Sequence, residues 1–300
     1  MKPTMNQVRT KRAFTIVELL TVMSIIVILI GLLVPALNKV KRFATDVRQK
    51  AQLHSMDAAI ELFSNEFGGY PDSSALDPQG LPYCGAMKLC EALMGQDLLG
   101  FHSNSIFRAD GRDASNAVVY PPDIDNLTPA LRAQNLGARK GPYLQAENAN
   151  AWRMRDIYGG NLGSFLGSSF VLCDVYQRLM QSGEKTGMPI LYYKADTANT
   201  FHDPNLAGSM TARDSMGNIY NYLDNNALVG LGKPWQGTGT SATPHRLADS
   251  LRFYRNTQSD KITTTQRPFR ADEYILISAG WDNEYGTADD ICNYEWKFRE

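Results

Sequence analysis

The chain has little of the chemistry that marks a metal-rich or disulfide-rich protein. Its 300 residues include only four cysteines and four histidines, too few for a disulfide-dense scaffold and a narrow basis for imidazole metal sites. It also lacks an excess of charge, because 30 lysines and arginines stand against 31 aspartates and glutamates. The whole chain therefore carries no electrostatic footprint for nucleic acid. With 43% hydrophobic residues, the composition excludes wholesale disorder, collagen and a coiled-coil rod.

Catalytic signatures are missing from the sequence as well. The histidines, at positions 54, 102, 202 and 245, stand in no G-x-S-x-G or H-E-x-x-H context. The Gly-x-Gly at residues 237–239 lacks the further glycine and lysine of a phosphate-binding loop. We therefore expect a protein that is not an enzyme.

Apolar residues are concentrated near the N-terminus. Residues 1–13 hold four lysines and arginines and no acid, and the 24 residues from 14 to 37 have Glu18 as their only formal charge. About 20 apolar residues suffice to cross the hydrocarbon core as a helix. The run exceeds the roughly 7–15 apolar residues of a secretory signal, and no A-x-A cleavage site follows it. We expect a single transmembrane helix at residues 14–37.

The charges around this helix bear on its orientation and on its function. The four leading cations favour a cytoplasmic N-terminus. Lys39, Lys41 and Arg42, which follow the span, favour the opposite orientation. An ionisable group within a membrane helix costs roughly 2.5–3.5 kcal/mol at mid-bilayer. Glu18 therefore predicts a functional contact, such as an ion pair with the free α-amino group of a neighbouring subunit. That pairing requires a cleavage that creates an amine close by.

Residues 12–20, R-A-F-T-I-V-E-L-L, resemble the type III (prepilin) signal of type IV pilins and type II secretion pseudopilins. The resemblance implies that prepilin peptidase cuts between Ala13 and Phe14 and N-methylates Phe14, leaving 1–13 as the leader peptide. It makes Glu18 the fifth residue of the mature chain. It also puts Pro35 where many pilins carry a helix-kinking proline. The family usually has glycine before the cut, where this chain has Ala13.

The same resemblance implies a structural subunit of a type II secretion system. Such subunits leave the inner membrane and stack with other pilin-like subunits through their N-terminal helices into a periplasmic pseudopilus, on an inner-membrane assembly platform. The globular domain then lies outside the cytoplasm. Two alternatives remain: a type IV pilin or minor pilin for adhesion or DNA uptake, and a membrane-anchored domain that never polymerises. Loss of the four leader cations takes the formal net charge from −1 to −5, which argues against non-specific nucleic-acid binding.

The rest of the chain predicts an α+β, pilin-like fold. Residues 38–67 continue the helix as an amphipathic segment, and Gly68, Gly69 and Pro71 end it. The domain at 68–300 then combines a small antiparallel sheet with large insertions. Apolar residues recur every three or four positions along the amphipathic segment, at Leu53, Met56, Ile60, Phe63 and Phe67. Further expected elements are helices at 83–99 and 169–181, strands at 189–194, 218–223 and 273–278, and a polar surface excursion at 230–268.

Four cysteines in an oxidising compartment are candidates for disulfides. They are Cys84, Cys90, Cys173 and Cys292, which allow three pairings. On one helix, Cys84 and Cys90 would lie about 9 Å apart along the axis, beyond the roughly 7 Å that a disulfide permits. That pair therefore requires Cys84 to precede the helix. Free buried thiols are the alternative.

An acidic loop at residues 278–296 follows the last predicted strand. Carboxylates on a short glycine-containing loop suit Ca²⁺, which takes oxygen ligands. An EF-hand does not fit, because Gly286 at its sixth position would put Trp281 at its first. The loop resembles the calcium loop of the major pseudopilins, which implies Ca²⁺ bound by Asp282, Asp289, Asp290 and backbone carbonyls. Trp296 or Tyr294 stands where that family has a closing aromatic residue. The alternative is a solvated acidic turn without an ion.

Overall fold

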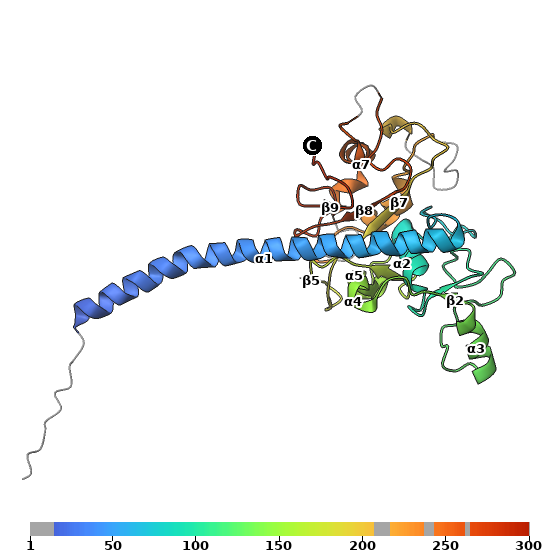
Figure 1. The fold of residues 1–300 in the computed structure, drawn as a ribbon, viewed down its shortest axis with the longest axis horizontal. Coiled ribbons are helices and arrows are strands. Elements are labelled where there is room, and N and C mark those ends of the chain that lie inside the picture. Colours follow the sequence, from blue (N-terminus) through green and yellow to red (C-terminus); the bar gives the residue numbers. More distant parts are fainter. Residues whose placement is uncertain (1–14, 207–216, 237–242, 262–264, 300) are drawn as a thin grey trace, which may run out of the picture. The chain divides into compact units, whose positions relative to one another are not determined.

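Helix α1, Ile16–Phe67, is the longest element of the computed structural model (Figure 1). The chain divides into two compact units, residues 1–44 and 45–300, so α1 contributes to both. The expected leader peptide, with Ala13 and Phe14, lies outside the described residues. Those residues are 15–206, 217–236, 243–261 and 265–299.

In the first unit, the helical residues 16–44 are all exposed. Leucine, isoleucine and valine side chains point in every direction around this part of the helix, and none is covered by protein. Pro35 lies inside the helix and has no N–H to donate to the preceding turn. The segment is long and apolar enough to cross a membrane.

In the second unit, a three-stranded antiparallel sheet lies at the centre. Its order is β7 (Leu191–Lys194), β8 (Tyr274–Ser278) and β9 (Ile291–Cys292). Leu191 lies opposite Ile277, and Ser278 lies opposite Ile291. The predicted strands at 189–194 and 273–278 are thereby confirmed, and together with α1 they give the α+β class.

Both faces of this sheet are buried, and successive side chains of each strand alternate between them. Tyr192 and Leu276 face the last part of α1 and helix α2 (Gly85–Met94), in a core with Met56 and Ile60. Tyr193 and Ile275 face the opposite core. That second core is built by the long segment between residue 71 and β8, which explains why the domain needs its insertions.

Two buried glutamines complete the packing of α1. The Gln52 amide donates to the carbonyls of Asn148 (3.0 Å) and Cys173 (2.9 Å), and Gln49 accepts from the N–H of Val175 (2.9 Å). These bonds satisfy backbone groups that burial would otherwise leave unpaired. The apolar spacing of this helix gives no sign of them.

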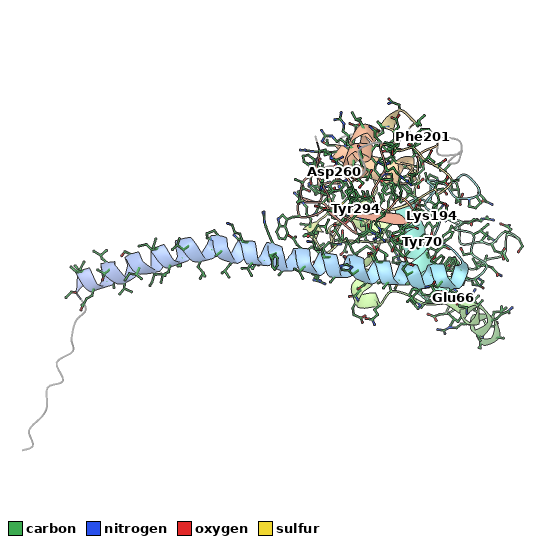
Figure 2. The ribbon with its side chains drawn as sticks, turned by 45° about the horizontal axis from the view of Figure 1, so that its top comes forward. Glu66, Tyr70, Lys194, Phe201, Asp260 and Tyr294 are labelled. Atoms are coloured by element: carbon green, nitrogen blue, oxygen red, sulfur yellow. The ribbon has the colours of Figure 1, made fainter. Side chains whose placement is uncertain are left out.

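At its end, α1 is held by aromatic and polar contacts. Gly68 stops the helix with a positive φ of 77°. The Tyr70 ring packs edge-on against Tyr274, 5.0 Å between centroids. Lys194 donates to the Tyr70 carbonyl (3.0 Å), and Figure 2 shows these two residues beside the last turn of the helix. The chain is thus turned back onto the sheet directly after the helix.

The helix predicted at 169–181 is wrong. The structure has two short strands there, β4 (Phe170–Leu172) and β5 (Arg178–Leu179), and the chain turns at Gly183, φ 90°, into β6 (Lys185–Thr186). Pairing of β4 with β3 (Ala151–Arg153) supplies backbone bonds that override the local helix pattern. Helix α2 is also shorter than the predicted 83–99, because Gly95 leaves the helical conformation with a φ of 83° and ends the helix.

Two further expectations need correction. No strand forms at 218–223: Asn218 makes one isolated bridge to Phe201, and helix α6 (Leu223–Gly230) begins at the end of the range. The segment 230–268 is not only a surface excursion, because helix α7 (Ser250–Thr257) buries Phe253 and Tyr254 in the second core. Residues 237–242 and 262–264 of this segment lie outside the described part. The remaining elements are β1 (Phe101–His102), α3 (Pro129–Gly137), β2 (Arg139–Lys140), α4 (Ala146–Ala149), α5 (Met154–Tyr158), η1 (Pro204–Leu206) and η4 (Arg246–Ala248).

Burial on the sheet predicts a contrast between two neighbouring positions of α1. Ile60 is fully buried, whereas Leu62 is 55% exposed. Ile60→Ala should lower the free energy of unfolding by about 2–5 kcal/mol, because it removes packed atoms and leaves a cavity. Leu62→Ala, the matched control, should change it by about 0.5 kcal/mol or less. Urea unfolding followed by tryptophan fluorescence measures both, and equal losses would contradict the packing described.

Candidate functional site

The first candidate site is the N-terminal turn of α1. Thr15 precedes the helix, and its N–H and hydroxyl both donate to Glu18 Oε2, at 2.9 and 2.8 Å. The Glu18 N–H in turn donates to the Thr15 hydroxyl at 3.3 Å. This is a capping box, in which two side chains satisfy two otherwise unpaired helix N–H groups. The sequence T-x-x-E carries the signal for it, but the sequence reasoning treated Glu18 only as a buried charge.

The capping box fixes where the carboxylate lies. Glu18 is held at the positive end of the helix dipole, which favours a negative charge there. Both Thr15 bonds end on Oε2, and the other carboxylate oxygen, Oε1, takes neither of them. The turn therefore presents a pre-oriented carboxylate directly after the residues of the expected cleavage site.

The second candidate site is the acidic loop between β8 and β9. Gly280 has a positive φ of 67°, and a Cβ there would lie 2.2 Å from the Asp289 carbonyl oxygen. Only glycine permits this approach. The Asp289 carboxylate also accepts the backbone N–H of Asp282 at 2.9 Å. The loop thus closes on itself, and Asp282 and Asp289 meet at its neck.

The three predicted calcium ligands divide into two groups. Burial raises the pKa of Asp282, and the negative charge of Asp289 raises it further. Asp290 turns inward and accepts the N–H groups of Gly286 (2.7 Å) and Thr287 (3.2 Å). Burial raises the pKa of Asp290 well above its ordinary value. The structure therefore brings Asp282 and Asp289 together and gives Asp290 a place in the interior.

Within the described ranges, no group of three or more His, Cys, Asp or Glu side chains is arranged to hold a metal. Of the two expected closing aromatic residues, Trp296 contacts the loop, because its indole N–H donates to the Thr287 carbonyl at 2.7 Å. Tyr294 instead stacks on Phe269. Asn283, which is not among the predicted ligands, is buried with its Oδ1 unpartnered. A polar oxygen is thereby left inside the loop.

Asp174 anchors the start of this loop and was also missed. Its buried carboxylate accepts the Ser278 hydroxyl (3.0 Å) and the N–H groups of Met188 (3.1 Å) and Tyr176 (3.2 Å). Burial raises its pKa from 3.8 to about 7. No motif marks the position, because the Ser278 hydroxyl that ties it to the loop comes from 104 positions further along the chain.

A hydrogen-bonded path connects this anchor with the C-terminal part of α1. The Tyr176 hydroxyl donates to Asp46 at 2.6 Å, and the adjacent Val175 N–H donates to Gln49. The Tyr176 ring also packs edge-on against Trp281 of the acidic loop, 5.9 Å between centroids. The second unit thus joins α1, the segment 173–176 and the loop by direct contacts.

The cysteines are free thiols in this structure. Cys84, Cys90 and Cys173 are buried, and Cys292 is half-buried. Cys84 lies directly before α2, the position that pairing with Cys90 would require. Burial raises the pKa of Cys84 to about 11, so its reactive thiolate form is disfavoured. Disulfide pairing of the four cysteines stays a prediction.

Comparisons with known proteins identify no relative of this chain. No protein-family model matches the chain, and no curated protein or solved structure matches it either.

The raised pKa of Asp174 predicts a pH dependence of stability. Between about pH 4 and 7 the folded protein keeps a proton that the unfolded chain releases. The contribution of Asp174 to the free energy of unfolding therefore falls as pH rises through this window. Asp174→Asn should remove this contribution, so the slope of its curve against pH should be more positive than the wild-type slope.

The measurement is urea unfolding at several pH values. Asp272→Asn is the matched control, because Asp272 is exposed; its curve should have the wild-type slope. An unchanged slope in Asp174→Asn would show that Asp174 does not hold a proton in the folded state.

Proposed function

We propose that the chain is a pseudopilin-like subunit of a type II secretion system, matured by prepilin peptidase and assembled through its N-terminal helix into a periplasmic pseudopilus. The supporting observation is a helix whose residues 16–37 are apolar and exposed, with one carboxylate in its first turn. In this proposal the protein is an inner-membrane, single-pass subunit with its N-terminus in the cytoplasm and its domain outside. Its role is structural and not catalytic.

The helix needs an apolar environment on all sides. Burial of apolar surface stabilises by about 25 cal/mol per Å², and the described structure covers none of residues 16–44. The lipid bilayer supplies this cover before assembly. In a fibre, the helices of neighbouring subunits supply the apolar cover. The same apolar residues therefore suit both the membrane-inserted subunit and the assembled subunit.

The bilayer accounts for the apolar residues but not for Glu18. A charged group in a membrane requires a partner. Phe14 directly precedes the Thr15 cap, so cleavage after Ala13 creates an α-amino group next to this turn. The amine of one subunit can then pair with the Glu18 carboxylate of another, which offsets the desolvation of both charges. The capping box supports this proposal because it orients the carboxylate in advance.

The domain also supports the pilin-like interpretation. The last part of α1 packs on one face of an antiparallel sheet, with the acidic loop between the last two strands. A type IV pilin or minor pilin, and an anchored domain that never polymerises, remain the alternatives. We favour the secretion subunit because its acidic loop resembles the calcium loop of the major pseudopilins.

Calcium is the second part of the proposal. The carboxylates of Asp282 and Asp289 lie close enough to repel one another, and Asn283 Oδ1 is buried without a partner. A cation ligated by oxygens would relieve both conditions. Asp282 and Asp289 would hold it together with loop carbonyls, while Asp290 stabilises the loop from within. When bound, Ca²⁺ would neutralise the loop and stiffen it.

Calcium binding predicts a stabilisation that depends on two side chains. Adding about 1 mM CaCl₂, the range of extracellular calcium modules, should raise the melting temperature of the full chain relative to the same sample in EGTA. Asp282→Asn with Asp289→Asn should abolish the rise, because the charged ligands are lost, whereas exposed Asp272→Asn should retain it. A wild-type protein that melts at the same temperature in both conditions would leave a solvated turn as the correct description.

The assembly proposal predicts that the charge of Glu18 is needed, and not only its hydrogen bonds. Glu18→Gln retains an amide oxygen for the Thr15 cap, since glutamine also serves in a capping box, but it loses the charge. Both Glu18→Gln and Glu18→Ala should remain in the membrane fraction and fail to cross-link into oligomers. The measurement is cross-linking in membranes that contain the secretion machinery.

Thr15→Val is the matched control for this experiment. It removes the capping hydroxyl and keeps the carboxylate, so it should still assemble. Wild-type assembly of Glu18→Gln would mean that the carboxylate acts only as a helix cap, and the proposed intersubunit pair would be wrong.

A further inference from the structure

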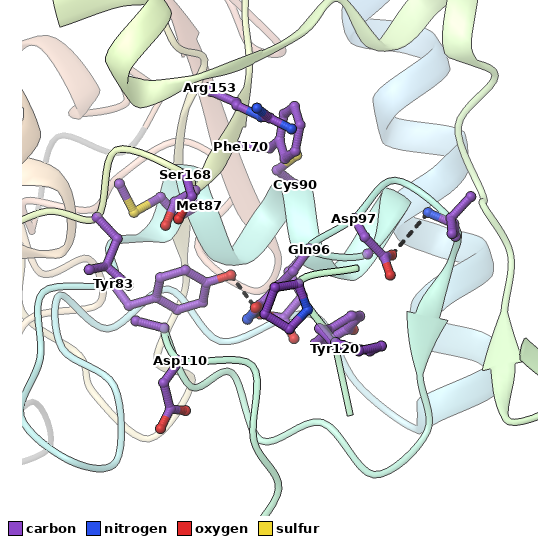
Figure 3. A pocket seen from close by; sticks show the side chains of 18 of the residues that line it. Tyr83, Met87, Cys90, Gln96, Asp97, Asp110, Tyr120, Arg153, Ser168 and Phe170 are labelled. Atoms are coloured by element: carbon purple, nitrogen blue, oxygen red, sulfur yellow. Dashed lines mark hydrogen bonds between the residues drawn. The ribbon is translucent and has the colours of Figure 1, made fainter. Parts of the chain in front are cut away.

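The unit of residues 45–300 contains a cavity of about 610 Å³. It lies between α2, the loops at 95–99 and 109–124, and the turn that joins α5 to β4 (Figure 3). It shares no residue with the Glu18 turn or the acidic loop. Its volume is within the roughly 300–1,000 Å³ of small-ligand sites.

The floor of the cavity is polar and internally bonded. Glu91 is 1% exposed and accepts the Tyr83 hydroxyl at 2.6 Å and the Gln96 amide at 2.9 Å. Ser105 donates to its other oxygen. Because these groups satisfy one another, the floor provides a rigid polar base. It does not require a ligand of its own.

Two arginines give one wall its charge. Arg153 and Arg155 both line the cavity, on either side of buried Met154. The Arg153 guanidinium lies 5.1 Å from the centre of the Phe170 ring, and Figure 3 shows the two side by side. Arg155 has a distant ionic contact with Asp156, at 3.8 Å. Neither contact matches the short bidentate geometry that arginine forms with a carboxylate.

The acids on the opposite wall are already neutralised. Asp97 binds Arg139 through two bonds of 2.8 and 2.9 Å, and Asp110 binds Arg108 at 2.5 Å. Glu91 is buried, and its two oxygens are occupied by Tyr83, Gln96 and Ser105. The charge that the exposed lining presents to a ligand is therefore that of the two arginines.

The remaining wall is apolar and partly open to solvent. Leu99 and Leu166 are each 44% exposed. They lie in the lining together with Pro121, Pro122 and Ile124. Exposed apolar side chains around a pocket mark a surface that gains free energy when a ligand covers it.

We propose that this cavity binds an amphipathic carboxylate, whose anionic group lies against Arg153 and Arg155 and whose apolar body covers Leu99, Leu166 and the two prolines. The C-terminus of a peptide that ends in apolar residues has this chemistry, and so does a medium-chain fatty acid. The inference stands apart from the proposed function, because it concerns neither the membrane helix nor the acidic loop.

The test is isothermal titration of the full chain in nanodiscs, with empty nanodiscs subtracted. Three probes are used: N-acetyl-Leu-Phe with a free carboxylate, the same dipeptide as its amide, and octanoate. Binding of either carboxylate without binding of the amide supports the proposal and identifies the source. Equal binding of dipeptide acid and amide, or no binding of any probe at the highest soluble concentration, overturns it.

Variants locate the bound group. Arg153→Gln with Arg155→Gln should weaken the carboxylate that binds by about tenfold or more, since charge-assisted bonds are the strong ones. Leu166→Glu should abolish binding by placing a negative charge at the exposed rim. Arg132→Gln is the matched control, because Arg132 is exposed and outside the lining. Wild-type affinity in the double arginine variant would overturn the assignment, and circular dichroism of each variant shows that the fold is kept.

Discussion

Burial of the last part of α1 against β7 and β8 is the contact on which the domain depends. Met56 and Ile60 share a core with Tyr192 and Leu276, from strands more than 80 positions apart in the chain. The pairing of β7 with β8 is not local, because these two strands come from distant segments. The helix supplies the apolar surface against which they meet. Gln49 and Gln52 then satisfy the backbone groups that this packing buries.

The same helix has two different surface patterns along its length. Its last turns have one apolar face, as expected beside a sheet, whereas residues 16–37 are apolar around almost the whole circumference, with Glu18 as their only formal charge. The sequence predicted this change from an all-apolar segment to a one-faced segment. The length of an apolar run and the three- or four-residue spacing of apolar positions each indicate how a helix is buried. The two central strands were readable for a similar reason. The T-x-x-E pattern in the sequence also indicates the capping role of Glu18. Treating Glu18 only as a charge in an apolar segment does not reveal this role.

The features that the sequence did not predict depend on contacts with other segments of the chain. Within the predicted helix at 169–181, β4 forms because β3 offers a partner and β5 forms because β6 does, and helix propensity reports neither pairing. Asp290 turns inward to Gly286 and Thr287, which adjacency to Asp289 does not reveal. Asp174 gains its role from Ser278, 104 positions away. Sequence patterns thus predicted where the acidic loop lies. Which of its carboxylates meet at the neck and which one is buried is seen only in the folded structure.

The account as a whole depends on how the N-terminus is processed, because the Glu18 pair needs an amine beside the Thr15 cap. Mass spectrometry of the N-terminal peptide from membrane-purified protein measures this directly. The account predicts a chain that begins at Phe14 with a methylated α-amino group. A mature protein that keeps residues 1–13 would contradict it and would leave an anchored, non-polymerising domain as the better description.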